Sequence, residues 1–383
     1  MGRYLIVATA GAGGDLQPLI ASAMGLRDRG HETVFLGDLS VQRSLGGLGL
    51  EVRVLPEELD LGPWLITAIQ EAMAATGGDA GAAGPIVLQR MKAWARDVAG
   101  PVGEDVRDLR PDAVVTSLFG VEVLDAVSPP CPWAVVNSTF YVGPGSPRTL
   151  EEDMAPRAIP LLRHYAGLLD SASLVLHATD PVFDVGFEGL PSRHHYVGPL
   201  GIWEPPAEPS PYLGEPGDPW VLVTISSQRQ DDTELAEAAL AALADRPLRV
   251  IATVGAGRAP EDLSTVPGNA RVERVVSHSA VLERGVLLVS HAGHGSVMKA
   301  LWHGRPMVLV PWGRDQPGVA ARAEALGVAG VVRREDASRA TLSSAIDRVL
   351  ADETMRERSA QHAARLQATD PKATAATLLE RLL

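Results

Sequence analysis

The sequence predicts an α/β protein of two doubly wound, Rossmann-like domains that face each other across a cleft, and three observations support this fold class. The chain has 383 residues, more than a single hydrophobic core usually contains. Short apolar runs alternate with helical segments in both halves, an order typical of parallel sheets. Between the halves, residues 201–219 are rich in proline and acidic residues, which predicts a linker without regular structure.

The first half, residues 1–200, begins with a strand–helix–strand unit. An apolar run and a glycine-rich loop precede a helical pattern, and Gly30 separates this helix from the next apolar run. Residues 41–100 have the composition of helices, except that the small residues at 75–85 predict a loop outside the core. The other expected elements are strands at 3–9, 32–36, 112–116, 133–137 and 174–177 and a helix at 16–28.

The second half, residues 220–365, repeats this alternation. Its apolar runs are too short for helices, and they read as buried parallel strands. Residues 366–383 are predicted to be helical. The expected elements are strands at 220–225, 286–289 and 307–310 and helices at 232–244, from about 296 and at 319–326.

Composition excludes several classes of protein. A net charge of −13 disfavours binding to nucleic acid or to an anionic membrane, because both require basic patches. No stretch approaches the apolar length of a membrane span, and the first strand is not followed by a signal-peptidase site, so we expect a cytoplasmic protein. Cys131 is the only cysteine, which excludes an internal disulfide and a cysteine-based metal cluster.

Two strand–loop–helix units between residues 286 and 327 carry the candidate functional residues. In the first, the turn with His291, Gly293 and Gly295 follows a strand and opens a helix. Glycines allow the backbone to approach a ligand, and free N–H groups at a helix start favour an anion such as phosphate. In the second unit, the strand is followed by Trp312, Asp315 and Gln316. Asp and Gln side chains suit recognition of vicinal hydroxyls.

This order of residues, His-x-Gly-x-Gly-Ser, then Gly-Arg-Pro, then Asp-Gln, resembles the donor-binding signature of family 1 glycosyltransferases of the GT-B fold. The resemblance implies that residues 220–365 bind a nucleotide sugar, that residues 1–200 bind the acceptor, and that the helix at 366–383 crosses back to the first domain. It assigns diphosphate binding to His291, Gly293, His294, Gly295, Ser296, Thr224 and Ser227, nucleobase contacts to Val276 and His278, and donor-sugar contacts to Trp312, Asp315 and Gln316.

The sequence departs from the family pattern at two positions that bear on the donor. Ser226 stands where a glycine is usual, which weakens the expected diphosphate contact there. Lys299 stands where many relatives have a glutamate that binds the ribose hydroxyls. A ribose 2′-OH would miss that acceptor more than a deoxyribose, so the sequence favours a dTDP-linked over a UDP-linked donor. The alternative is that Lys299 is an ordinary exposed helix residue.

The catalytic base is expected in the first half. The run from Gly11 to Pro18 resembles the opening of bacterial antibiotic glycosyltransferases, which implies that Asp15 accepts the proton of the acceptor hydroxyl. The alternatives are that Asp15 only caps the next helix, or that Glu122 or Asp125 is the base. An apolar wall for a flat acceptor is predicted from aromatic and methionine side chains, each of which could instead be core: Trp64, Met91, Phe119, Phe140 and Tyr141.

The resemblance implies an inverting glycosyltransferase that moves a deoxysugar from a dTDP-sugar to an aromatic or polyketide natural-product aglycone, through an O- or C-glycosidic bond. We expect no metal and no other cofactor, because no Asp-x-Asp motif stands in a suitable loop and a helix N-terminus can hold the phosphates. A homodimer is possible. Two other functions stay open: a GT-B nucleotide-sugar epimerase, and a non-catalytic partner of a glycosyltransferase.

Overall fold

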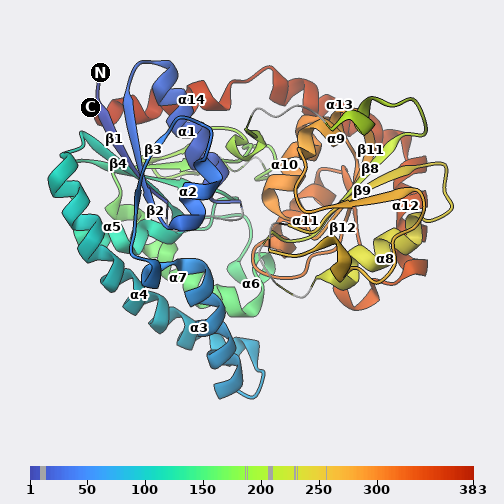
Figure 1. Cartoon of the computed structure of the whole chain (residues 1–383), viewed down its shortest axis with the longest axis horizontal. Helices are drawn as coiled ribbons and strands as arrows, with labels where there is room; N and C mark the ends of the chain where they lie inside the picture. Colours follow the sequence, from blue (N-terminus) through green and yellow to red (C-terminus); the bar gives the residue numbers. More distant parts are fainter. Residues whose placement is uncertain are drawn as a thin grey trace. The chain divides into compact units, whose positions relative to one another are not determined.

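The computed structural model describes residues 1–8, 14–185, 187, 189–205, 210–227, 230, 232–255 and 257–383. These residues belong to two compact units. The first unit comprises Met1–Trp203 and Asp370–Leu383, and the second comprises Glu204–Thr369. Each unit is built on one sheet that helices cover, as Figure 1 shows. The chain therefore consists of two α/β units, of which the first is completed by its last residues.

A parallel seven-stranded sheet with the order β3-β2-β1-β4-β5-β6-β7 forms the centre of the first unit. Side chains of β1 alternate between two core clusters: Leu5 and Val7 lie in one, Tyr4 and Ile6 in the other. Because both faces of the sheet are buried, its central strands are mostly apolar, with polar residues such as Ser117 and Asn137 toward the strand ends. The strands are β1 (Arg3–Ala8), β2 (Glu32–Gly37), β3 (Glu51–Val54), β4 (Ala113–Ser117), β5 (Trp133–Asn137), β6 (Leu174–His177) and β7 (His194–Tyr196).

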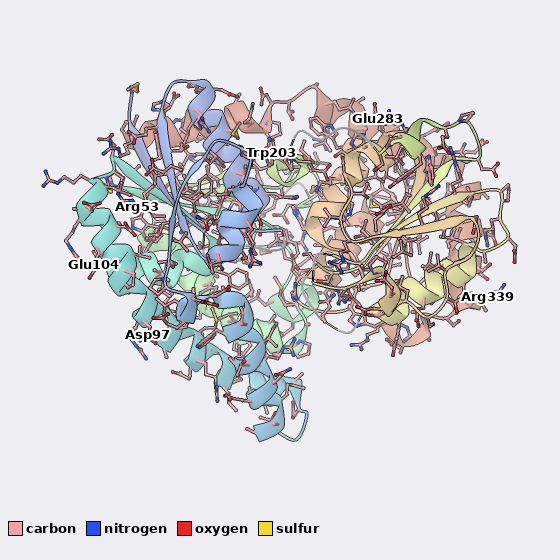
Figure 2. The ribbon with its side chains drawn as sticks, viewed as in Figure 1. Arg53, Asp97, Glu104, Trp203, Glu283 and Arg339 are labelled. Atoms are coloured by element: carbon pink, nitrogen blue, oxygen red, sulfur yellow. The ribbon has the colours of Figure 1, made fainter. Side chains whose placement is uncertain are left out.

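The longest helix of the first unit, α4 (Ala80–Leu109), is amphipathic. Met91, Trp94 and Val98 lie on its buried face. Asp97 and Glu104, seven positions apart, are exposed on its outer face (Figure 2). The other helices are α1 (Leu16–Asp28), α2 (Leu39–Leu45), α3 (Leu61–Ala75), α5 (Val121–Val127), α6 (Leu150–Asp153), α7 (Ile159–Leu168) and α14 (Pro371–Leu379), with 3-10 turns at η1 (Glu57–Leu59), η2 (Leu118–Gly120), η3 (Pro156–Ala158), η4 (Leu169–Ser171), η5 (Leu200–Ile202) and η9 (Glu380–Leu382).

The prediction of a loop outside the core at residues 75–85 holds only for 76–79, which form the turn between α3 and α4, and it is wrong for 80–85. Helix α4 begins directly after Asp79, whose carboxylate caps it. Ala83 is fully buried, and a Cβ built at Gly84 would lie 2.9 Å from Pro160. The small residues therefore serve close packing of α4 rather than a loop, a distinction that composition alone does not make.

Helix α14 packs against α1 and completes one face of the first sheet, with Ala375, Ala376 and Leu379 in the same core cluster as β1. The two helices approach so closely that a Cβ built at Gly25 would lie 2.7 Å from the carbonyl oxygen of Lys372. Any larger residue at position 25 would therefore push α14 away.

A parallel six-stranded sheet with the order β10-β9-β8-β11-β12-β13 forms the centre of the second unit. The strands are β8 (Trp220–Thr224), β9 (Arg249–Thr253), β10 (Ala270–Glu273), β11 (Gly285–Ser290), β12 (Met307–Leu309) and β13 (Ala329–Val331). The helices are α8 (Thr233–Leu243), α9 (His278–Arg284), α10 (His294–Trp302), α11 (Gln316–Ala325), α12 (Arg339–Ala351) and α13 (Glu353–Gln367), with 3-10 turns at η6 (Pro211–Gly214), η7 (Pro260–Asp262) and η8 (Arg334–Asp336).

In the segment 201–219, the described residues 201–205 and 210–219 contain local structure, unlike the predicted linker without regular structure. The 3-10 turn η5 ends there at Ile202, η6 lies within it, and Leu213 is buried. The ring of Tyr212 packs near Trp220 and under the guanidinium of Arg271, 4.8 Å from the ring centre. Proline breaks helices and strands but fits the first position of a short turn, which is where Pro211 stands. Among all helices within the described ranges, none has the length and apolar content that crossing a membrane requires.

Candidate functional site

The strand order of the second sheet reverses between β8 and β11, and there the loops from the two strands separate. Parallel sheets bind ligands at such switch points, outside the carboxyl ends of the strands. Thr224 and Ser290 are paired at the ends of β8 and β11. The structure therefore brings together the two sets of predicted diphosphate residues, Thr224 and Ser227 after β8 and the turn that begins at His291 after β11. Thr224 is buried, whereas Ser227 is exposed.

His291 is held in one orientation. Its side chain is buried, and its Nδ1 donates a hydrogen bond to the carbonyl oxygen of Thr224, at 3.3 Å. A Cβ built at Gly293 would lie 2.6 Å from Nε2 of His291, so only glycine fits at position 293. Burial lowers the pKa of His291, although the Asp232 carboxylate opposes this shift. The imidazole is therefore neutral at rest, with its Nε2 unprotonated.

Helix α10 begins at His294, two residues earlier than the sequence predicted. Its N-cap is Gly293, which provides no side chain to bond the first N–H groups. Ala292, just before, has a φ of 65°, a strained value for a residue other than glycine. A Cβ built at Gly295 would meet nothing within 4 Å, so the backbone is open on that side. This strained turn aims the positive end of a helix outward beside His291, an arrangement that suits an anion.

The predicted sugar-binding pair lies at the start of α11, which begins at Gln316 rather than at 319. Asp315 is partly exposed, and its carboxylate makes no capping bond to the helix. Gln316 is buried, and its Oε1 accepts hydrogen bonds from the N–H groups of Trp312 and Gly313, both at 2.8 Å. In this structure Gln316 thus shapes the turn, and Asp315 is the member of the pair that can reach a ligand.

Trp312 is partly buried in the core of the second unit. The guanidinium of Arg334 lies 4.2 Å from the centre of its ring, a cation–π contact. One face of the indole is therefore occupied by Arg334, which limits how a sugar could stack on it.

Lys299 is not the exposed helix residue of the alternative interpretation, because only 4% of its surface is accessible. Its ammonium forms an ion pair with Glu204, at 3.2 Å. The same carboxylate accepts hydrogen bonds from the hydroxyl of Ser277 at 2.6 Å and from the N–H groups of His278 and Ser279 at 3.1 and 3.2 Å. Burial acts to raise the pKa of Glu204, but Lys299 and these donors outweigh it and lower the pKa.

The predicted nucleobase residues lie next to this ion pair. His278 is the first residue of α9, and its Nε2 lies 3.0 Å from the hydroxyl of Thr253. Burial, reinforced by the Lys299 ammonium, lowers the pKa of His278 to about 4, so the ring is neutral at pH 7. Val276 is partly buried just before the helix.

The first sheet also reverses its strand order, between β1 and β4, and Asp15 follows β1. The predicted loop residues Gly11, Ala12 and Gly13 lie outside the described residues. The Asp15 side chain makes no capping bond to α1. Instead, Oδ1 of Asp15 accepts a hydrogen bond from the hydroxyl of Ser138, which directly follows β5. The capping interpretation of Asp15 is therefore wrong, and its role as the base stays a prediction.

The two alternative bases lie on α5. Glu122 is paired with His164, at 2.9 Å between its carboxylate and Nε2, so its oxygens are engaged. Asp125 is exposed on the helix surface. Both residues follow the carboxyl end of β4, as Asp15 follows that of β1, so their place relative to the sheet does not separate the three candidates.

Three residues of the predicted acceptor wall are core side chains in this structure. Met91 and Phe140 have no accessible surface, and Tyr141 has 1%. Tyr141 stacks on Phe187, with ring centres 5.3 Å apart. Aromatic residues fill cores as often as pockets, and the sequence could not separate the two cases. Phe119 is partly buried against the same core.

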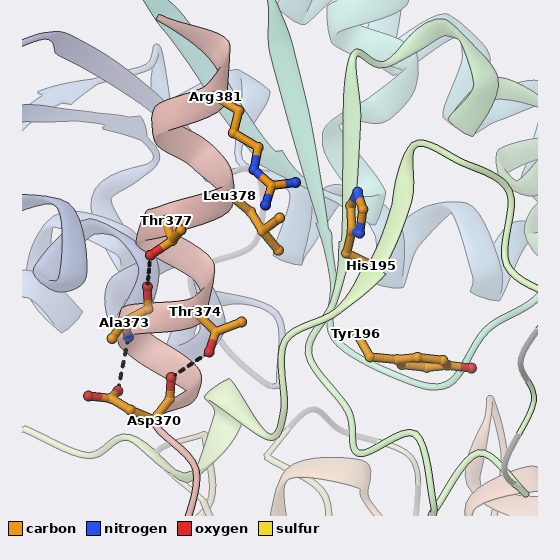
Figure 3. Close-up of a pocket in the computed structure, with 8 residues that line it drawn as sticks. All are labelled: His195, Tyr196, Asp370, Ala373, Thr374, Thr377, Leu378 and Arg381. Atoms are coloured by element: carbon orange, nitrogen blue, oxygen red, sulfur yellow. Dashed lines mark hydrogen bonds between the residues drawn. The ribbon is translucent and has the colours of Figure 1, made fainter.

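Trp64 differs from these three because it lines a surface pocket of about 330 Å³, together with Glu57, Glu58, Asp60 and Arg90. A second pocket, of about 470 Å³, lies between β7 and α14 (Figure 3). Its lining residues are His195, Tyr196, Asp370, Ala373, Thr374, Thr377, Leu378 and Arg381. None of the predicted site residues lines this second pocket, so it is separate from the donor and base residues. Within the described ranges, no group of His, Cys, Asp or Glu is arranged to hold a metal ion.

Sequence reasoning missed three residues that shape these sites. Ser138 bonds the proposed base, Glu204 pairs with Lys299, and Asp232 holds the loop after β8. Of these three, only Ser138 could have been predicted from the sequence, because the carboxyl ends of β1 and β5 lie at the same edge of a parallel sheet. Glu204 and Asp232 are acidic residues in a proline-rich segment and before a helix, where a solvated side chain is the ordinary expectation.

Comparisons with known proteins agree with this geometry. The family model "Erythromycin biosynthesis protein CIII-like, C-terminal domain" matches residues 237–381. The chain is 26% identical to 4'-demethylrebeccamycin synthase of Lentzea aerocolonigenes, over 100% of both chains. It is 33% identical to TDP-daunosamine transferase DnrS of Streptomyces peucetius over 195 residues, which cover 49% of this chain and 44% of that protein.

The fold is also that of a solved structure, CalG4, the calicheamicin glycosyltransferase. The TM-score is 0.71 at 21% sequence identity, and the match covers 100% of this chain and 98% of the other. Three observations lead to the same conclusion: two parallel sheets of Rossmann type, a turn suited to phosphate at the switch point of the second sheet, and a relative that matches over the full length. The chain is a glycosyltransferase with the GT-B fold, and it is similar to family 1 enzymes of the natural-product type.

Proposed function

We propose that the protein transfers a deoxysugar, with inversion, from a dTDP-linked donor to a hydroxyl of an aromatic or polyketide aglycone, without a metal ion. The observation that carries this proposal is the turn of His291, where a neutral imidazole and the uncapped start of α10 stand together at the switch point. A relative whose name specifies a TDP-linked sugar supports the choice of nucleotide.

The leaving group in this reaction is the nucleoside diphosphate. As the bond between the anomeric carbon and the phosphate oxygen breaks, negative charge grows on that oxygen. The N–H groups of Gly295 and Ser296 at the start of α10 can stabilise this charge without a metal ion. Because Nδ1 of His291 already donates to Thr224, its Nε2 can donate to a phosphate only after taking up a proton. The diphosphate itself favours that uptake, since an adjacent anion raises the pKa of an imidazole.

The acceptor hydroxyl must lose a proton as its oxygen attacks the anomeric carbon from the face opposite the leaving group. We assign this proton to the carboxylate of Asp15, with Ser138 holding Oδ1 in place. Attack from the opposite face inverts the anomeric configuration. Phenolic acceptors suit a carboxylate base, because they release the proton more readily than alcohols do.

The choice of dTDP over UDP rests on the Glu204–Lys299 pair. The Glu204 carboxylate already accepts from Lys299, from the Ser277 hydroxyl and from two backbone N–H groups. A ribose 2′-OH near Lys299 would therefore compete for an acceptor that is in use, whereas a 2′-deoxyribose has no such need.

This choice can be tested by exchanging the two residues. Lys299→Glu alone would place two buried carboxylates side by side, so we use the double variant Glu204→Lys with Lys299→Glu, which keeps an ion pair. We expect it to shift preference toward UDP by about 1–3 kcal/mol, read as the ratio of the two dissociation constants. An unchanged ratio would leave the pair a purely structural role.

The proposed function is tested on the wild-type protein in two steps. First, dTDP and UDP are compared by thermal shift, since a ligand that binds only the folded state raises its melting temperature. Second, a dTDP-deoxysugar is incubated with and without a panel of phenolic and macrolide aglycones, and products are separated by mass spectrometry. A glycosylated aglycone supports the proposal. A changed sugar without acceptor would indicate an epimerase, and binding of neither nucleotide would indicate a non-catalytic partner.

A further inference from the structure

A buried ion pair lies under the loop that follows β8. Asp232 has no accessible surface, Arg258 has 8%, and their side chains are 2.8 Å apart. Asp232 precedes α8 but does not cap it. Instead, Oδ1 accepts from Arg258, which follows β9, and Oδ2 accepts from the N–H of Ser226 at 2.6 Å and from Nε2 of Gln230 at 3.1 Å.

Arg258 fixes the same loop from the other side. Its Nη1 donates to the carbonyl oxygens of Ser226 at 2.7 Å and of Val254 at 3.2 Å. The two partners of the ion pair therefore hold both backbone groups of Ser226. The next strand loop is pressed against this one, since a Cβ built at Gly255 would lie 3.1 Å from Cα of Ser227. The backbone at Ser226 and Ser227 is thus held by buried charges and close packing.

The ion pair extends to the second strand loop through two glutamines. The amides of Gln230 and Gln316 bond each other reciprocally, at 3.2 and 3.4 Å. Oε1 of Gln316 in turn accepts the N–H groups of Trp312 and Gly313 in the turn after β12. A continuous chain of hydrogen bonds therefore runs from Asp232 through Gln230 and Gln316 to the turn that carries the predicted sugar contacts.

We propose that Asp232 is a positioning residue that joins the diphosphate-binding and sugar-binding parts of the donor site into one rigid arrangement. The loop after β8 and the turn after β12 otherwise share no secondary structure, and they come from strands that are not neighbours. A buried ion pair is costly to desolvate, and apolar residues would pack a loop at lower cost. Its presence here is explained by the fixed orientation that it gives to both segments. This inference rests on the proposed donor-site function.

Breaking the hydrogen bonds between Gln230 and Gln316 should weaken binding of the dTDP-sugar more than binding of free dTDP. Gln230→Ala leaves the ion pair intact but cuts the connection to Gln316. We expect the KM for the dTDP-sugar to rise and its kcat/KM to fall about tenfold, while the Kd of free dTDP changes less than about threefold. Asp232→Asn should weaken both, because it also releases the loop after β8. Kinetics with the donor sugar and calorimetry with dTDP measure the two quantities.

The double variant tests whether the residues act as one chain. If they do, Asp232→Asn with Gln230→Ala costs no more in kcat/KM than Asp232→Asn alone. Additive effects would overturn the inference. The inference would also be overturned if Gln230→Ala changed the affinities for the donor and for dTDP equally. If Asp232→Asn does not fold, Gln230→Ala alone is sufficient as the test.

A matched control is Asp347→Asn, which breaks the Arg246–Asp347 ion pair of the second unit, 2.6 Å long. Arg246 precedes β9, so it lies at the amino edge of the sheet, away from the site. We expect this variant to leave donor and dTDP affinities unchanged. If the wild type is active and Gln230→Ala behaves like this control, the inference is overturned but the proposed function is not. If the wild type neither binds dTDP nor transfers sugar, the proposed function is overturned as well.

Discussion

Both units place a buried histidine at the carboxyl edge of their sheet, His177 at the end of β6 and His291 after β11, but they surround it differently. Both nitrogens of His177 are bonded: the Asn137 amide lies 3.0 Å from Nδ1, and Nδ1 of His194 lies 3.1 Å from Nε2. His291 bonds the protein through Nδ1, and its Nε2 faces a glycine.

This difference shows that a buried histidine can stabilise the fold in one unit and be placed to bind a ligand in the other. The amide N–H of Asn137 occupies Nδ1 of His177, so its Nε2 carries the hydrogen and donates to His194. A proton added to His177 would break this arrangement. A proton added to His291 would create the donor that a diphosphate requires. His177 therefore cannot take up a proton without losing its hydrogen bonds, whereas His291 can take one up and donate it to a ligand.

The largest effect is expected at Asp15, which is the reactive group proposed for the edge of the first sheet. Asp15→Asn keeps the shape of the side chain but removes its capacity to accept a proton, so turnover should fall by about 10²- to 10⁴-fold. The melting temperature should barely change, because the side chain makes no helix cap. Steady-state rates and thermal unfolding of this one variant are the measurements. A rate near that of the wild type would redirect the search to Asp125.

His291→Ala should reduce turnover by about 10²- to 10³-fold, because it removes a donor to the leaving group. In the wild type we also expect dTDP affinity to fall as pH rises. Burial lowers the pKa of free His291 and the bound diphosphate raises it, so binding takes up a proton between these two pKa values. Calorimetry from pH 6 to 8.5 should show this slope in the wild type and a flatter one in His291→Ala. Equal slopes would contradict the assigned role.

His177 should make the protein sensitive to acid. Burial lowers its pKa to about 3, below the unfolded value of 6.5, so the unfolded state binds more protons between these pH values. Stability is then fully present above pH 6.5 and declines by about 1.4 kcal/mol per pH unit on the way to pH 3. His177→Gln, with no proton to gain, should show a shallower decline in urea unfolding at pH 7 and pH 4.5. The same slope in both proteins would place the acid sensitivity elsewhere.

The smallest effect concerns two glycines of the same turn. Gly295→Ala adds a methyl group that meets no protein atom, so stability should rise by up to about 1 kcal/mol while dTDP binds more weakly. Gly293→Ala forces the new methyl group against His291 and should reduce turnover more than Gly295→Ala does. Tm and the Kd of dTDP separate the two. If Gly295→Ala bound dTDP normally, the phosphates would not approach the start of α10.

The alternation of strands and helices and the position of the donor turn could be predicted because they depend on local patterns. Buried parallel strands are continuous apolar runs, and a glycine turn between strand and helix is read directly from the residues around His291. What the sequence could not reveal are pairings between distant positions. Glu204 and Lys299 are 95 residues apart and Asp232 and Arg258 are 26 apart, so no local pattern connects them.

Gln316 shows a different limit. Its residue type fits sugar recognition and turn formation equally well, and only the hydrogen bonds to Trp312 and Gly313 reveal which one its oxygen serves in this structure. Met91 and Phe140 illustrate the same ambiguity for apolar side chains. The residue type limits the roles that a side chain can have, and the surrounding residues determine which of these roles it takes.

The packing of α14 against α1 has a consequence for the order in which the protein folds. Ala375, Ala376 and Leu379 enter the core of the first unit only after the whole second unit, Glu204–Thr369, has been translated. Until then, the surface of α1 around Gly25 lacks its cover and presents apolar side chains to the solvent. The second unit has no such gap, because its sequence is continuous. It can therefore complete its core once Thr369 is available, whereas the unit that precedes it must also wait for α14.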